Sequence, residues 1–257
     1  MQGRWEDCDL SDDSTPPPGS NQGETSLTAI RSIRLPLAVF LLAFFATWTL
    51  RATWLYSIDE QIASPWIRFA YANAVKAILW LTPAAIFTAR ILRQRPTAFC
   101  ADIWPGRQQW IACILITTLY LAAVAAFELS VGNKRFSLHR ISSGSGDQQW
   151  PSLFVTLQLL VSPLIEELFF RGFLLPTMYQ IVGRWTAIAT NSLLFMLIHW
   201  PYWLSHAESA RLFVANSIGV CGFALLASWL YDRSRSVWPP TLAHTCNNLL
   251  AMVLVAN

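Results

Sequence analysis

The chain has 257 residues, of which 54% are hydrophobic and only 13% are charged. Soluble domains carry about a quarter charged residues, so this composition excludes an ordinary soluble protein and predicts a polytopic membrane protein. The net charge is +3 and the basic residues are scattered, which argues against a nucleic-acid-binding protein. The five cysteines form no Cys-x-x-Cys pair, so neither a disulfide framework nor a zinc–thiolate site is predicted.

The first 34 residues are mostly polar. They contain the acidic pair Asp12 and Asp13 and a run of three prolines at 16–18, and they show no apolar periodicity. Such a segment cannot bury enough apolar surface to fold, so we predict a disordered polar tail over 1–34. Residues 1–30 also lack the basic start and apolar stretch of a cleavable signal peptide, so we expect the first membrane span to be retained.

Seven apolar segments follow the tail, each near the ~20 residues that a membrane-spanning helix needs. They are placed at 35–56, 69–92, 109–131, 151–170, 186–204, 212–231 and 238–256. The predicted fold class is therefore all-α, a polytopic transmembrane helix bundle of about seven spans. The N-terminal spans, within 35–149, carry no recognisable motif, whereas 150–257 holds the polar motifs described below.

The short loops that would share one side of the membrane with the N-terminus are richer in arginine than those on the other side. Because cytoplasmic loops carry the excess of basic residues, we predict a cytoplasmic N-terminus. Three further ionisable residues lie in or near the N-terminal spans. Arg51 and Lys76 are within reach of an interface by snorkelling, and Glu128 is near the end of its span, so none of them is expected in the site.

Residues 163–171 place two carboxylates and an arginine in an apolar run. Each ionisable group near the centre of a membrane helix costs roughly 2.5–3.5 kcal/mol, so such groups face the interior of the bundle and point to function. Glu167 and Arg171 are four residues apart and are predicted to pair. Glu166 is rotated from Glu167 by about 100° and is left free to act. A purely architectural ion network of the three residues is the alternative.

Two later spans also carry polar side chains. His199 ends the apolar run 192–199, and His244 and Asn248 share one face of the last span. The three segments avoid exposing these groups to lipid if they converge on one cavity. There, a carboxylate with a neutral histidine can activate a water molecule for attack on a carbonyl, while His244 and Asn248 can stabilise the oxyanion.

Two carboxylates and two histidines are also a plausible ligand set for zinc or another divalent metal. The sequence contains no His-Glu-x-x-His motif, which is the common helical signature of zinc proteases. We therefore favour activated water without a cofactor and keep the metal site as the alternative.

Three motifs occur in order: Glu166-Glu167-x-x-x-Arg171, Phe195-x-x-x-His199 and His244-x-x-x-Asn248. Together they resemble the motifs of the CPBP family, the CAAX-processing and bacteriocin-processing membrane endopeptidases also called Abi proteins. The resemblance covers roughly residues 150–256.

The resemblance implies an intramembrane peptidase of the glutamic type, with a membrane-associated protein or peptide as its substrate. Some members cleave the C-terminal tripeptide from prenylated CAAX proteins. By the resemblance, Glu166 and His199 would activate water, His244 and Asn248 would form the oxyanion hole, and Glu167 with Arg171 would support the geometry. Many members are bacterial, so the expected location is the bacterial inner membrane.

Two other classes of function are open. A non-catalytic immunity or partner-binding bundle would keep the polar cluster as a structural link between helices. A transporter would use the same groups as a proton relay, but the sequence has neither inverted repeats nor paired glycine-broken spans.

Overall fold

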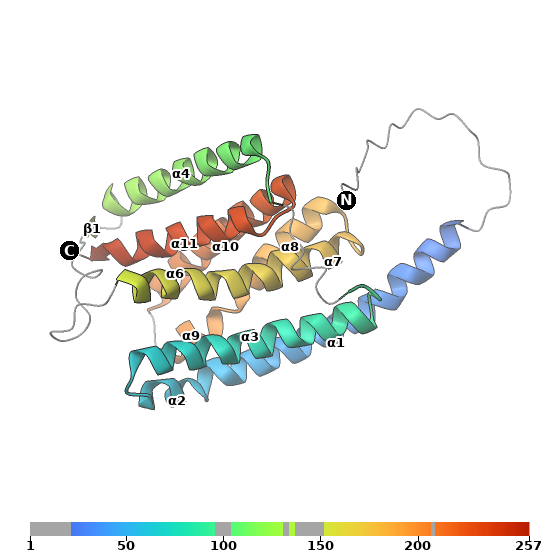
Figure 1. The fold of residues 1–257 in the computed structure, drawn as a ribbon, viewed down its shortest axis with the longest axis horizontal. Helices are drawn as coiled ribbons and strands as arrows, with labels where there is room; N and C mark the ends of the chain where they lie inside the picture. Colours follow the sequence, from blue (N-terminus) through green and yellow to red (C-terminus); the bar gives the residue numbers. More distant parts are fainter. Residues whose placement is uncertain (1–21, 96–103, 131–133, 137–151, 207–208, 257) are drawn as a thin grey trace.

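The structure, a computed structural model, describes residues 22–95, 104–130, 134–136, 152–206 and 209–256. Nearly all of the described residues are helical, which confirms the predicted all-α fold (Figure 1). The helices are α1 (Gln22–Thr53), α2 (Tyr56–Gln61), α3 (Pro65–Arg90), α4 (Arg107–Ser130), α6 (Ser152–Glu167), η1 (Leu168–Leu174), α7 (Leu175–Tyr179), α8 (Arg184–Leu197), α9 (Trp200–Ser205), α10 (Ala210–Ser234) and α11 (Trp238–Val253). Two short strands, β1 (Lys134–Phe136) and β2 (Leu254–Ala256), pair in antiparallel register.

Four described helices are long and apolar enough to cross a membrane: Ile33–Thr53, Pro65–Arg90, Arg107–Ser130 and Ala210–Ser234. The other three predicted spans also coincide with helices, but these are shorter. Segment 151–170 changes from α6 into the wider turn of η1, and segment 186–204 is divided into α8 and α9 next to Pro201. The protein is thus an integral membrane helix bundle, and crossings beyond these four stay a prediction.

The first helix begins earlier than the sequence suggests. It starts at Gln22, inside the segment 1–34 for which we predict disorder, and residues 1–21 of that segment lie outside the described part of the chain. Residues 24–34 contain neither glycine nor proline, so the backbone can continue the helix of the apolar span toward the N-terminus. The predicted end of the tail at residue 34 is therefore too late.

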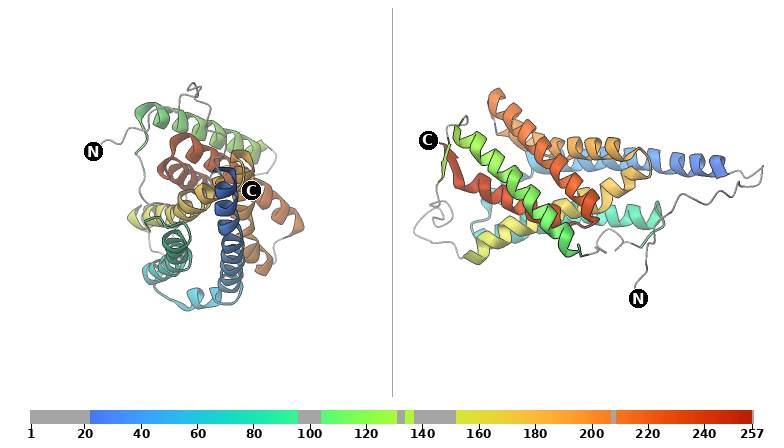
Figure 2. Two further views of the ribbon diagram at one scale, coloured as in Figure 1. Left: turned by 90° about the vertical axis from the view of Figure 1, so that its right-hand side faces the viewer. Right: turned by 90° about the horizontal axis from the view of Figure 1, so that it is seen from above.

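The bundle has two sides, with α1 and α3 on one side and α4 on the other (Figure 1 and Figure 2). Between them, α6 contacts α3 and α11, and α10 packs against both α8 and α11. A buried aromatic cluster joins α1 and α3 to η1, with the rings of Phe44 and Phe169 stacked at 4.4 Å and Trp80 wholly buried beside them. Since large buried rings dominate packing, this cluster fixes η1 against the N-terminal helices.

Arg51 does not reach toward an interface. It lies at the end of α1, where α2 supplies Asp59, and its guanidinium donates to both carboxylate oxygens at 2.7 and 2.5 Å. Both side chains are at least nine-tenths buried. The expectation that Arg51 snorkels is wrong, because a local acidic partner satisfies its charge inside the protein.

Candidate active site

The site is built around the junction of α6 and η1. Glu166 and Glu167 are the last residues of α6, and the π-helical turn η1 begins directly after them. In this wider turn Leu175 donates its backbone N–H to the carbonyl of Phe170, and Asn191 of α8 donates to the same carbonyl at 2.9 Å. Turns of this π-helical kind are rare in proteins, and those that occur often lie at functional sites.

Glu167 and Arg171 form the predicted ion pair, inside the protein. Nη1 of Arg171 lies 3.1 Å from both oxygens of Glu167, and both side chains are fully buried. Nη2 donates to the backbone carbonyl of Ala224 in α10 at 3.0 Å, and the guanidinium lies over the ring of Phe195 at 4.5 Å. The pair thus ties η1 to α8 and α10.

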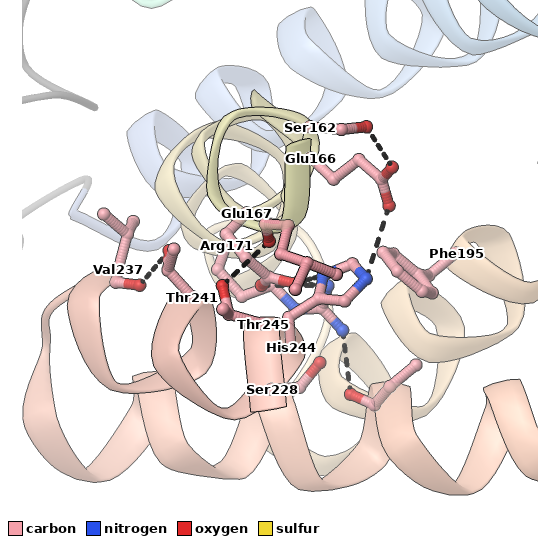
Figure 3. A network of polar contacts seen from close by, with 12 residues as sticks. Ser162, Glu166, Glu167, Arg171, Phe195, Ser228, Val237, Thr241, His244 and Thr245 are labelled. Atoms are coloured by element: carbon pink, nitrogen blue, oxygen red, sulfur yellow. Dashed lines mark hydrogen bonds and ion pairs between the residues drawn. The ribbon is translucent and has the colours of Figure 1, made fainter. Parts of the chain in front are cut away.

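His244 of α11 lies between the two carboxylates (Figure 3). Its Nδ1 is 2.9 Å from Oε1 of Glu167, and its Nε2 is 3.9 Å from Oε2 of Glu166. Because a carboxylate only accepts, the Nδ1–H donates to Glu167, which fixes the ring and leaves Nε2 facing Glu166. Asn248 follows one helical turn later on α11 and is partly buried.

His199 lies where α8 gives way to α9. Its Nδ1 is 2.9 Å from the carbonyl of Phe195, so Nδ1 carries the hydrogen and Nε2 is left as the basic nitrogen. The ring packs against Phe195 and Trp203, with centroids 5.2 and 5.5 Å apart. His199 and Glu166 are close enough to interact electrostatically, although no hydrogen bond joins these two described side chains.

Sequence reasoning missed Lys76. This α3 residue donates to Oε1 of Glu166 and, at 2.7 Å, to the hydroxyl of Ser162. The expected snorkelling is therefore wrong, and Glu166 is not left without a cationic partner. The cost of an ionisable group in an apolar segment, which drew attention to the glutamates, applied equally to Lys76 and could have identified it. Ser162 lies one turn before Glu166 and lines the same side of the carboxylate (Figure 3).

Across the described ranges, no three His, Cys, Asp or Glu side chains come close enough together to hold a metal ion. The structure brings Glu167, Arg171 and His244 into direct contact, and Glu166 lies beside His244. Phe195 of α8 borders this cluster, and His199 follows at the junction of α8 and α9. The convergence of three apolar segments, which the sequence predicted, is therefore present in the fold.

Residues 148–250 match the family described as type II CAAX prenyl endopeptidase Rce1-like. The chain is also 22% identical over 102 residues to a protein of Bacillus subtilis (strain 168) with the name "Putative membrane peptidase YdiL". That alignment covers 40% of the chain and 37% of the relative, so the chain matches little more than a third of the length of this curated relative. No solved structure matches the chain.

Proposed function

We propose that this integral membrane protein is an endopeptidase that hydrolyses a membrane-associated protein, since residues 148–250 match the Rce1-like family. The observation that carries the proposal is the state of Glu166. Glu166 is buried, Lys76 and Ser162 hold its Oε1, and its Oε2 is buried without a hydrogen-bond partner in the described chain. A buried acceptor that is left open suits a bound water molecule.

Glu166 and His199 would activate this water. The water oxygen attacks the peptide carbonyl carbon while its proton passes to Glu166 or to Nε2 of His199. The same proton then moves to the amide nitrogen, and the carbon–nitrogen bond breaks to give a carboxylic acid and an amine. No covalent bond forms between the substrate and the protein in this reaction.

The oxyanion that forms on the carbonyl needs hydrogen-bond donors. His244, held through Nδ1 by Glu167, would present Nε2–H when the ring is protonated, and Asn248 would offer its side-chain amide from the same helix face. A donor in such a position is worth on the order of 3–4 kcal/mol in the transition state. Arg171 would contribute by holding Glu167, and through it His244, in place.

Charge balance favours activated water over a metal ion. Lys76 compensates Glu166, and Arg171 compensates Glu167, so each carboxylate already has a cationic partner. A divalent ion would have to displace one of these cations before it could bind. The metal-dependent version of the reaction is tested with a chelator below.

The proposed location is the bacterial inner membrane with the N-terminus in the cytoplasm. The C-terminal end of α3, the start of α4, the start of α8 and the end of α10 lie at one end of the bundle (Figure 1). Arginines occupy all four positions, at Arg90, Arg107, Arg184 and Arg233. This grouping supports the orientation because basic residues favour the cytoplasmic side.

The proposal is tested with purified protein in detergent. The substrates are a fluorogenic prenylated CAAX peptide and a set of membrane-anchored peptides without the prenyl group. Wild type is compared with Glu166→Gln at matched thermal stability, with and without a chelator. Cleavage that is lost in the variant and survives chelation supports the glutamate-activated water, whereas loss on chelation supports the metal-dependent alternative.

A non-catalytic immunity or partner-binding protein is the second candidate. The fully buried contacts of Arg171 link η1 to α10, as a structural ion network would. This candidate predicts no cleavage of any peptide by wild type and a Glu166→Gln variant that is less stable than wild type.

A further inference from the structure

We propose that Lys76, which lies outside the family match, is a positioning residue of the hydrolytic site. It holds Glu166 ionised and turned so that Oε2 stays open for the attacking water. The inference rests on the proposed function, because it gives that site a component from the N-terminal helices.

The first support is the placement of the ammonium group. Lys76 contacts Oε1 of Glu166 and the hydroxyl of Ser162, and the side chains of Lys76 and Glu166 are 13% and 9% exposed. Both contacts fall on the same side of the carboxylate, which leaves only Oε2 without a hydrogen bond. Placing the Lys76 ammonium in this apolar interior is unfavourable unless an ionised Glu166 compensates its charge.

The second support is the surrounding aromatic cage. The Lys76 ammonium lies 4.9 Å from the ring centre of Trp80 and 5.8 Å from that of Trp48. The Trp48 indole also donates to the carbonyl of Ile198 at 2.8 Å, directly before His199. Cation–π contacts stabilise a desolvated ammonium, so α1 and α3 fix the charge beside Glu166 and tie it to the segment that carries His199.

The two cations of the site, Arg171 and Lys76, therefore have different roles. Arg171 is fully buried and bonded to both Glu167 and the backbone, as suits a fixed support. Lys76 offers a single ammonium group, which contacts Oε1 of the carboxylate whose Oε2 is open. Removing it leaves a buried carboxylate without compensation, and such a group takes up a proton and no longer activates water.

The test combines kinetics with infrared spectroscopy on the full-length protein. Lys76→Met is expected to lower kcat at neutral pH about 10- to 100-fold, the equivalent of one charged hydrogen bond, with KM changed less than about twofold. Lys76→Arg is expected to recover most of the activity. Lys76→Ala is expected to be rescued by propylammonium and not by tetramethylammonium at equal ionic strength. The matched control is Arg51→Met, which breaks another buried ion pair away from the site and should lower stability without changing kcat.

Infrared spectra test whether Lys76 keeps Glu166 ionised, and this measurement does not depend on activity. Lys76→Met should show the carbonyl band of a protonated carboxylic acid, absent from wild type and from Lys76→Met combined with Glu166→Gln. A wild-type kcat in Lys76→Met, or no acid band that depends on Glu166, would overturn the inference while leaving the proposed peptidase intact. Wild type without peptidase activity would instead contradict the proposed function, and the infrared comparison would still decide the role of Lys76.

Discussion

Replacing Arg171 with methionine should strongly destabilise the protein. The guanidinium is fully buried, donates to Oε1 of Glu167, lies 3.1 Å from Oε2 of the same carboxylate and donates to the Ala224 carbonyl. Its removal leaves Glu167 as an uncompensated buried charge and the carbonyl without its donor. Breaking a buried pair from one side costs about 3–5 kcal/mol, and the absence of solvent contact removes any reason to discount this figure. A tenfold change in the unfolding equilibrium constant corresponds to about 1.4 kcal/mol. The unfolding equilibrium constant of Arg171→Met should therefore exceed that of wild type by a factor of about 10² to 10³ or more.

The measurement is reversible unfolding in mixed micelles, followed by tryptophan fluorescence. Arg90→Met serves as the control, since Arg90 is exposed at the end of α3 and should change stability by less than about 0.5 kcal/mol. Adding Glu167→Gln to Arg171→Met should recover part of the loss because the orphaned charge is removed. A loss within about 1 kcal/mol for Arg171→Met would refute the idea that this pair anchors the site.

Two further variants separate chemistry from architecture. Asn248→Ala should lower kcat about 10²- to 10³-fold at unchanged stability if the amide stabilises the oxyanion, and a change confined to KM would exclude that role. Asp232→Asn acts far from the site, where the carboxylate accepts from Tyr179 at 3.0 Å and from Arg184 at 2.9 Å. Because Arg184 is half exposed, the expected loss of unfolding free energy is about 1–2 kcal/mol, with kcat per folded molecule unchanged.

Local spacing predicted the features that depend on one helix. The Glu167–Arg171 pair follows from the i, i+4 rule, and each apolar segment coincides with a helix because hydrophobic length is a strong signal. The wide turn of η1 has no comparable signature. It depends on donors from other helices, such as the Asn191 amide at the Phe170 carbonyl.

The sequence alone did not predict which side chains of distant segments would contact one another. Lys76 and Glu166 are 90 residues apart, and nothing in either segment says which faces meet. The histidines show the same limit. Their convergence was predictable, but the sequence did not show that His244 would lie between the two glutamates while His199 is bonded to the carbonyl of Phe195.

In the proposed reaction Glu166 activates the water molecule that hydrolyses the peptide bond. The most direct measurement is cleavage of the prenylated and membrane-anchored peptides by wild type and by Glu166→Gln of equal thermal stability, in the presence of chelator. We expect cleavage by wild type and a loss of at least about a thousandfold in the variant, since the general base is removed. Equal cleavage by both proteins, or cleavage abolished by the chelator, would contradict it.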